Sequence, residues 1–218
     1  MAEGKESFMA KTKQSHSLTF KADLSKPPSR ALWLVKWLLL IPHFIVLALL
    51  WVAYTVVAII AFIAILFTAK YPRKLFDFNV GVLRWTWRVG FYGYWILGTD
   101  EYPPFSLKST DYPADLDVEY PEKLSRGLIF VKWLLAVPHY LVLAPLMGLG
   151  QWNQAEPGFP VIGLILILAI IIAILLLFTK KYNKDIFKLN TGIIRWMFRV
   201  MVYVGFMTDQ YPPFKLDE

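Results

Sequence analysis

The chain has 218 residues, of which 57% are hydrophobic, and its mean hydropathy is +0.48. A soluble domain needs less apolar material to fill its core, so this composition predicts an integral membrane protein. The sequence contains no cysteine, which excludes disulfides, thiolate catalysis and cysteine-ligated metal centres.

The formal net charge is +7, from 23 Lys and Arg against 16 Asp and Glu. Basic residues beside membrane helices are expected first to set topology and to contact anionic head groups. We therefore expect anionic membrane lipids as partners and no nucleic acid.

Residues 1–16 are polar and charged and predict an N-terminal tail. Residues 18–23 and 116–120 alternate apolar and polar side chains, which is typical of half-exposed strands. We predict that these two extended segments pair with each other, or with the two Tyr-Pro-Pro-Phe segments further along the chain, in a small cytoplasmic cap.

Two long stretches, residues 31–68 and 134–179, are nearly uncharged, and each far exceeds the roughly 20 apolar residues that span a bilayer. Polar residues and helix breakers between positions 146 and 160 predict a loop that divides the second stretch into two segments near spanning length. We therefore predict a helical hairpin there and, by internal similarity, a spanning or partly re-entrant hairpin in the first stretch. The alternative is one long tilted helix per stretch, because residues 48–54, where the first hairpin would turn, contain neither Gly nor Pro.

The basic residues favour the hairpins. All 23 Lys and Arg lie outside residues 37–69 and 133–179. Two crossings per stretch place every positive charge on one side of the membrane, whereas one crossing would place the nine basic residues of 70–132 on the opposite side. This arrangement predicts a multi-pass protein with cytoplasmic N- and C-termini.

Each hydrophobic stretch is followed by an apolar segment that carries arginines, residues 72–97 and 183–207. On a helix of the first segment, Arg84 and Arg88 share one face, and Trp87 lies on the opposite one. The second segment repeats this pattern. Both segments therefore predict basic amphipathic helices that lie in the membrane interface, anchored by Trp and Tyr rings.

The sequence contains an internal repeat. Thirteen of the twenty positions in residues 29–48 match residues 125–144. Each copy ends with Thr-Asp-x-Tyr-Pro-Pro-Phe, at residues 99–105 and 208–214, where the prolines favour an extended chain. We interpret the chain as a tandem duplication.

The predicted fold is an all-α membrane protein of two tandem repeats. Each repeat combines a transmembrane hairpin, a basic interfacial helix and short extended cytoplasmic segments. After the tail, the first repeat covers residues 17–108 and the second covers residues 109–218.

His43 and His139 occupy equivalent positions in the two repeats, one residue after a proline and inside the hydrophobic stretch. Paired intramembrane histidines are unusual. One hypothesis is that they are axial ligands of haem or of a chlorophyll-type pigment. The alternative is a neutral imidazole that needs no cofactor and hydrogen-bonds a carbonyl group freed by the proline.

Basic residues also recur in equivalent sets that are candidate binding sites for lipid phosphate head groups, because arginine presents a planar fork that suits phosphate. The alternative is ordinary positive-inside charge. We expect Asp100 and Asp209 to pair with the arginines or to cap helix ends. The two sets are Lys36, Arg84 and Arg88, and Lys132, Arg195 and Arg199.

Catalytic motifs are missing from the sequence. It contains no Gly-rich phosphate loop, no nucleophile triad and no metal-ligand cluster, and outside the predicted loop at 146–160 no acidic residue lies inside a hydrophobic stretch. We therefore predict that the protein is not an enzyme, needs no metal and is not a proton-coupled transporter.

The Val-Lys-Trp-Leu-Leu-x-x-Pro-His block and the Thr-Asp-x-Tyr-Pro-Pro-Phe block resemble a bacterial family of integral-membrane domains of unknown function, over residues 18–216. This resemblance implies a location in the bacterial plasma (inner) membrane and no particular activity. We expect a non-enzymatic accessory or scaffold subunit of a larger complex, with other membrane-protein subunits as partners. The alternatives are a lipid-binding or lipid-transport protein that uses the basic sets, and a haem- or chlorophyll-binding subunit.

Overall fold

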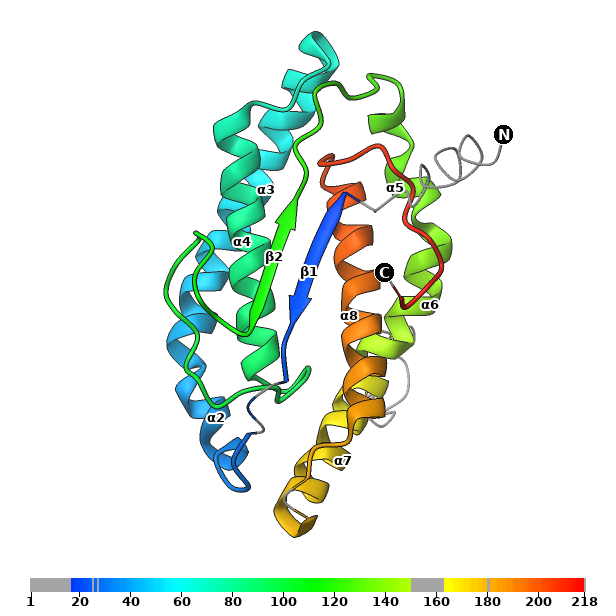
Figure 1. Ribbon diagram of the computed structural model, residues 1–218. Helices are drawn as coiled ribbons and strands as arrows, with labels where there is room; N and C mark the ends of the chain where they lie inside the picture. The colour runs from blue at the N-terminus through cyan, green and yellow to red at the C-terminus, as the bar shows by residue number, and fades with distance from the viewer. Residues whose placement is uncertain (1–16, 25, 27, 150–162, 180, 218) are drawn as a thin grey trace, which may run out of the picture.

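The computed structural model describes residues 17–217 except 25, 27, 150–162 and 180, so the predicted N-terminal tail lies outside the described residues. The described part is mostly helical (Figure 1). In chain order its elements are β1 (Leu18–Ala22), α2 (Trp33–Leu39), α3 (Ile41–Thr68), α4 (Arg73–Tyr92), β2 (Ala114–Val118), the 3₁₀-helix η1 (Leu128–Phe130), α5 (Lys132–Leu135), α6 (Val137–Met147), α7 (Leu164–Thr179) and α8 (Lys184–Val204).

The first hydrophobic stretch forms the short helix α2 and then one long helix, α3. α3 runs for 28 residues and is long and apolar enough to cross a membrane. Pro42 lies in its first turn, where the missing N–H removes no helical hydrogen bond. The predicted hairpin is therefore wrong for the first repeat, since the absence of Gly or Pro in residues 48–54 lets the helix continue.

The second hydrophobic stretch does not reverse direction either. α6 ends at Gly148 and α7 begins after Gly163, where a Cβ atom would lie 2.3 Å from the Gly148 backbone nitrogen. In Figure 1, α7 continues in the direction of α6. The predicted hairpin is wrong here too, because α7 starts close to the end of α6 and runs in the same direction instead of returning along it. The predicted loop falls largely on residues outside the described part.

α4 and α8 are the predicted amphipathic helices, but they lie at the centre of the molecule. Between Asn79 and Tyr92 only Thr86 is not buried. α3 packs against one side of α4 and β2 packs against another. The two helices were predicted correctly, but neighbouring segments cover their polar faces. Their location in the membrane interface stays a prediction.

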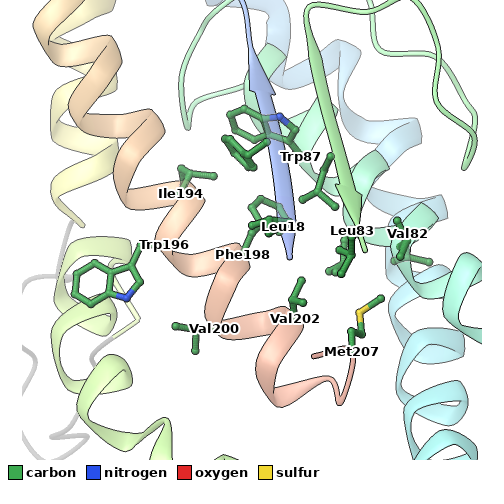
Figure 2. Packing of buried hydrophobic residues seen from close by; sticks show 14 of the residues in the cluster. Leu18, Val82, Leu83, Trp87, Ile194, Trp196, Phe198, Val200, Val202 and Met207 are labelled. Carbon is green, nitrogen blue, oxygen red and sulfur yellow. The ribbon is translucent and has the colours of Figure 1, made fainter. Parts of the chain in front are cut away.

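β1 and β2 form a two-stranded antiparallel ribbon, which confirms that the two extended segments pair with each other. Phe20 lies opposite Leu116. The Phe20 ring centroid lies 4.3 Å from that of Trp87 on α4 and 5.8 Å from that of Phe198 on α8. Figure 2 shows Trp87 and Phe198 in the core between the ribbon and the two helices. The ribbon therefore joins the two sequence repeats, which we call the first and second units, around one shared core.

The two units run in opposite directions. α3 ends at one end of the molecule and α7 ends at the other, and the ribbon lies in front of α4 and α8 in Figure 1, with α3 behind α4. The helices away from the ribbon expose large hydrophobic side chains, which we call the outer apolar face. On the first unit it includes Leu34, Trp37, Ile45, Leu49, Val52, Val56, Ile59, Ile63 and Phe67, and on the second Phe130, Trp133, Leu141, Leu166, Ile170, Ile174, Leu177 and Phe178.

Candidate functional site

Lys36 is the centre of a buried polar cluster where the apolar helices of the first unit begin. Its side chain is 1% exposed, and its Nζ atom lies 3.2 Å from Oδ1 of Asp100. Nζ also donates to the Thr99 carbonyl at 2.6 Å and lies 4.5 Å from the ring centroid of Tyr92. Burial lowers the pKa of the Lys36 ammonium group below its ordinary value, while Asp100 opposes that shift.

The second unit repeats this cluster. Lys132 Nζ lies 2.8 Å from Oδ1 of Asp209, donates to the Thr208 carbonyl at 2.7 Å and lies 5.2 Å from the ring centroid of Tyr203. The aspartates also accept from backbone amides, Asp209 from Ser125 at 2.7 Å. Asp100 and Asp209 thus pair with lysines instead of the expected arginines, and each pair ties the start of an apolar helix to the Thr-Asp-x-Tyr-Pro-Pro-Phe segment of its own unit.

His43 lies seven residues, or about two helical turns, beyond Lys36 and is fully buried. Its Nδ1 accepts a hydrogen bond from the Trp85 indole at 3.0 Å, and its ring stacks on Phe105 with centroids 4.0 Å apart. His139 makes the same contacts, with the Trp196 indole at 2.9 Å and with Phe214 at 3.9 Å. The imidazole partner is therefore an indole, not the proline-freed carbonyl that we expected.

This geometry tests the haem or chlorophyll hypothesis. An indole N–H only donates, so the Nδ1 lone pair of each histidine is occupied and a neutral ring carries its proton on Nε2. Nε2 of both rings is buried and has no hydrogen-bond partner among the described residues. An axial ligand needs an accessible nitrogen lone pair, so the residues present do not fit such a cofactor.

The arginines of the first unit bind other parts of the chain. Arg84 donates to the Leu116 carbonyl at 2.8 Å and to Oδ1 of Asp117 at 2.9 Å, so it holds strand β2. Arg88 donates to the carbonyls of Ser106 and Lys108 at 3.1 and 2.8 Å. The contacts of Lys36 and those of the two arginines are thus with different segments.

The arginines of the second unit have equivalent roles. Arg195 donates to the Leu216 carbonyl at 3.1 Å, and Arg199 donates to the carbonyls of Lys215 and Asp217 at 3.1 and 2.7 Å. These guanidinium groups fasten the C-terminal segment onto α8. Contact of the two basic sets with lipid phosphate stays a prediction.

Sequence reasoning missed the aromatic partners of the histidines. Trp85 and Trp196 belong to matching Arg-Trp pairs, and Phe105 and Phe214 end the matching Tyr-Pro-Pro-Phe segments. Their recurrence with the histidines was the available signal. It also missed an apolar pocket of about 370 Å³ between α3 and α4, whose lining includes Phe44, Ala48 and Val89.

The fold and the buried clusters define a mostly helical protein with a helix long and apolar enough to cross a membrane, in which a lysine–aspartate pair and a histidine–tryptophan pair recur in each unit. The chain belongs to the family described as Domain of unknown function (DUF4389), whose model matches residues 30–106 and 161–215. The predicted membership of a family of unknown function is thereby confirmed. No curated protein and no solved structure matches the chain. Among the described residues, no group of three or more His, Asp and Glu is placed to hold a metal ion.

Proposed function

We propose that this protein is a non-enzymatic scaffold or accessory subunit of a bacterial membrane complex, held in the membrane by α3 and by α6 with α7. The outer apolar face carries the proposal. Ile45 is 62% exposed, Leu49 69% and Phe67 72%, on a helix that buries only one narrow stripe inside the protein. Such a continuous apolar surface is expected to contact lipid or the helices of other subunits.

The buried polar groups support a structural role. Lys36, Arg84 and Arg88 are held by carboxylates and carbonyls of the same chain. Such contacts hold the extended segments on the helices and satisfy buried donors. We assign these residues to the architecture of the scaffold, not to chemistry on a substrate.

The ribbon is the surface that we assign to a water-soluble partner or domain. Its outward side exposes Thr19, Lys21, Asp117 and Glu119, whereas Phe20 and Leu116 face the core. Such a scaffold has one apolar side in the membrane and a polar ribbon on its opposite side. It can therefore hold a soluble component next to membrane subunits.

The test is gentle detergent extraction from the native host, followed by sizing and mass spectrometry of the material that co-elutes. We expect stoichiometric foreign subunits, and we expect them to be lost from a Thr19→Arg/Glu119→Arg variant. The matched control, Lys184→Ala/Asp185→Ala, changes exposed residues at the start of α8 and should retain them. A homogeneous particle of this chain alone would refute the scaffold proposal.

The pocket between α3 and α4 favours lipid binding as a second candidate function. Its lining is almost entirely apolar, with Phe44, Ala48 and Val89 among the lining residues, and its volume of about 370 Å³ suits part of an acyl chain. An Ala48→Phe variant would fill the pocket. Loss of a co-purifying lipid from Ala48→Phe, but not from the exposed variant Leu49→Phe, would support this function; equal lipid content would oppose it.

A further inference from the structure

We infer that the protein lies in the plane of one membrane leaflet, with α3, α6 and α7 in the hydrocarbon and the β1–β2 ribbon facing water, and that it does not cross the bilayer. The inference rests on the membrane attachment in the proposed function and specifies its geometry. Four observations carry it.

The first observation is the direction of the apolar helices. α3 is followed by Lys70, Arg73 and Lys74, and α7 by Lys181 and Lys184. Because the two units run in opposite directions, these basic groups lie at opposite ends of the molecule (Figure 1). If the helices crossed a membrane, the groups would lie on opposite sides, against the positive-inside rule. If the helices lie in the plane of the membrane, the basic groups at both ends contact the same anionic surface.

The second observation is the position of the ribbon. β2 packs against α4 and β1 against α8, alongside the middle of these helices (Figure 1). In a crossing orientation, exposed Lys21, Asp117 and Glu119 would lie near the centre of the bilayer, where charged side chains are costly. This cost vanishes when the ribbon faces water.

The third observation is the length of the apolar surface. α3 has 28 residues and is about 42 Å long, whereas the hydrocarbon core is roughly 30 Å thick. Exposed Leu34 and Trp37 on α2 extend this surface further. A crossing helix would push apolar side chains into water or require a strong tilt, whereas an in-plane helix has no limit of this kind.

The fourth observation is that charge and apolar surface lie on different sides. Exposed charges lie on the ribbon, on the connecting segments and in the first two turns of α4 and α8, while α3 has no charged residue along its length. A helix roughly 10–12 Å wide fits within one leaflet about 15 Å deep. Half-exposed Tyr102 and Tyr211 lie beside the starts of the apolar helices, where amphipathic rings contact the interface.

The absence of native cysteine allows a direct test with single-cysteine variants. Lys74→Cys and Lys184→Cys place a thiol at each end of the molecule, at exposed positions. We expect a membrane-impermeant maleimide to label both variants in inside-out inner-membrane vesicles and neither in right-side-out vesicles. Labelling of one variant from each side would overturn the inference and leave the membrane attachment intact. Release of the full chain by alkaline carbonate would overturn both.

Depth measurements supply a second test. Ile45, Val52 and Ile63 lie along one stripe of α3 and are 62%, 66% and 51% exposed. Spin labels at these three positions should have the same immersion depth in vesicles of phosphatidylglycerol and phosphatidylethanolamine. A label at Thr19 on the ribbon should be accessible to a water-soluble relaxation agent. A depth profile with Val52 deepest, together with a shielded Thr19 label, would overturn the in-plane orientation.

Discussion

Phe20 lies directly opposite Leu116 in the antiparallel ribbon, and the two residues are as far apart in the sequence as Lys36 and Lys132. The ribbon therefore pairs residues at equivalent positions of the two units. An antiparallel pair centred on such residues relates the units by an approximate twofold rotation. This relationship explains why the lysine–aspartate and histidine–tryptophan contacts of one unit recur in the other and why the apolar helices run in opposite directions.

The Lys36–Asp100 pair should be a strong determinant of stability. We expect Lys36→Ala to lower the free energy of unfolding by about 3 kcal/mol, because Asp100 loses its ammonium partner and a buried site is left unfilled. The measurement is chemical unfolding in detergent. The control is Arg73→Ala, which breaks the exposed Arg73–Asp77 pair and should cost less than about 0.5 kcal/mol. Equal costs for the two variants would contradict the role given to Lys36.

The Trp85–His43 hydrogen bond should also stabilise the fold. Trp85→Phe removes the indole donor and leaves the buried Nδ1 atom of His43 without a partner, so we expect a loss of about 1–2 kcal/mol. Trp196→Phe should have the same effect through His139. Nitrogen NMR of the native protein should show the tautomer protonated on Nε2. The exposed Trp37→Phe is the control, and a loss no larger than that of Trp37→Phe would rule out this contribution.

Gly81 allows the segment after the first Tyr-Pro-Pro-Phe to lie against α4. A Cβ atom on Gly81 would lie 2.7 Å from Cβ of Leu107 and 2.9 Å from its carbonyl oxygen. We expect Gly81→Ala to displace this segment, to cost about 1–3 kcal/mol and to speed proteolysis near Leu107. A Cβ atom on Gly127 meets no atom within 4 Å, so Gly127→Ala is the matched control and should leave proteolysis unchanged. Unchanged proteolysis of Gly81→Ala would show that the segment does not need this close approach.

Alkaline pH should weaken the fold through Tyr71. Burial raises the pKa of the Tyr71 hydroxyl from 10 to about 12, so its favourable contribution is complete below pH 10 and is lost as the pH rises towards 12. We expect Tyr71→Phe to remove about 2–3 kcal/mol from the decrease in unfolding free energy between pH 10 and pH 12. Unfolding curves at several pH values, with Trp37→Phe as a non-titrating control, measure this difference. The same pH dependence in native protein and Tyr71→Phe would exclude Tyr71 as its source.

The local elements of this fold follow from the sequence. Alternation of apolar and polar residues predicted both strands, and the long apolar stretch predicted helix, although not the single continuous course of α3. The recurrence of His43 at position 139 marked both buried sites before any contact was known. These features depend on near neighbours in the chain, which is why a sequence pattern contains them.

The tertiary structure alone decided the path of the chain and the partners of its charges. The hairpins were inferred from a rule that assumes crossing helices, and the rule contains no information about helices that run in opposite directions around a ribbon. Arg84 and Arg88 have the spacing of a solvent-facing polar stripe, yet carbonyls from distant segments satisfy them. Hydrogen bonds between residues far apart in the chain leave no local period in the sequence, so only the folded structure distinguishes a buried arginine from one at a membrane surface.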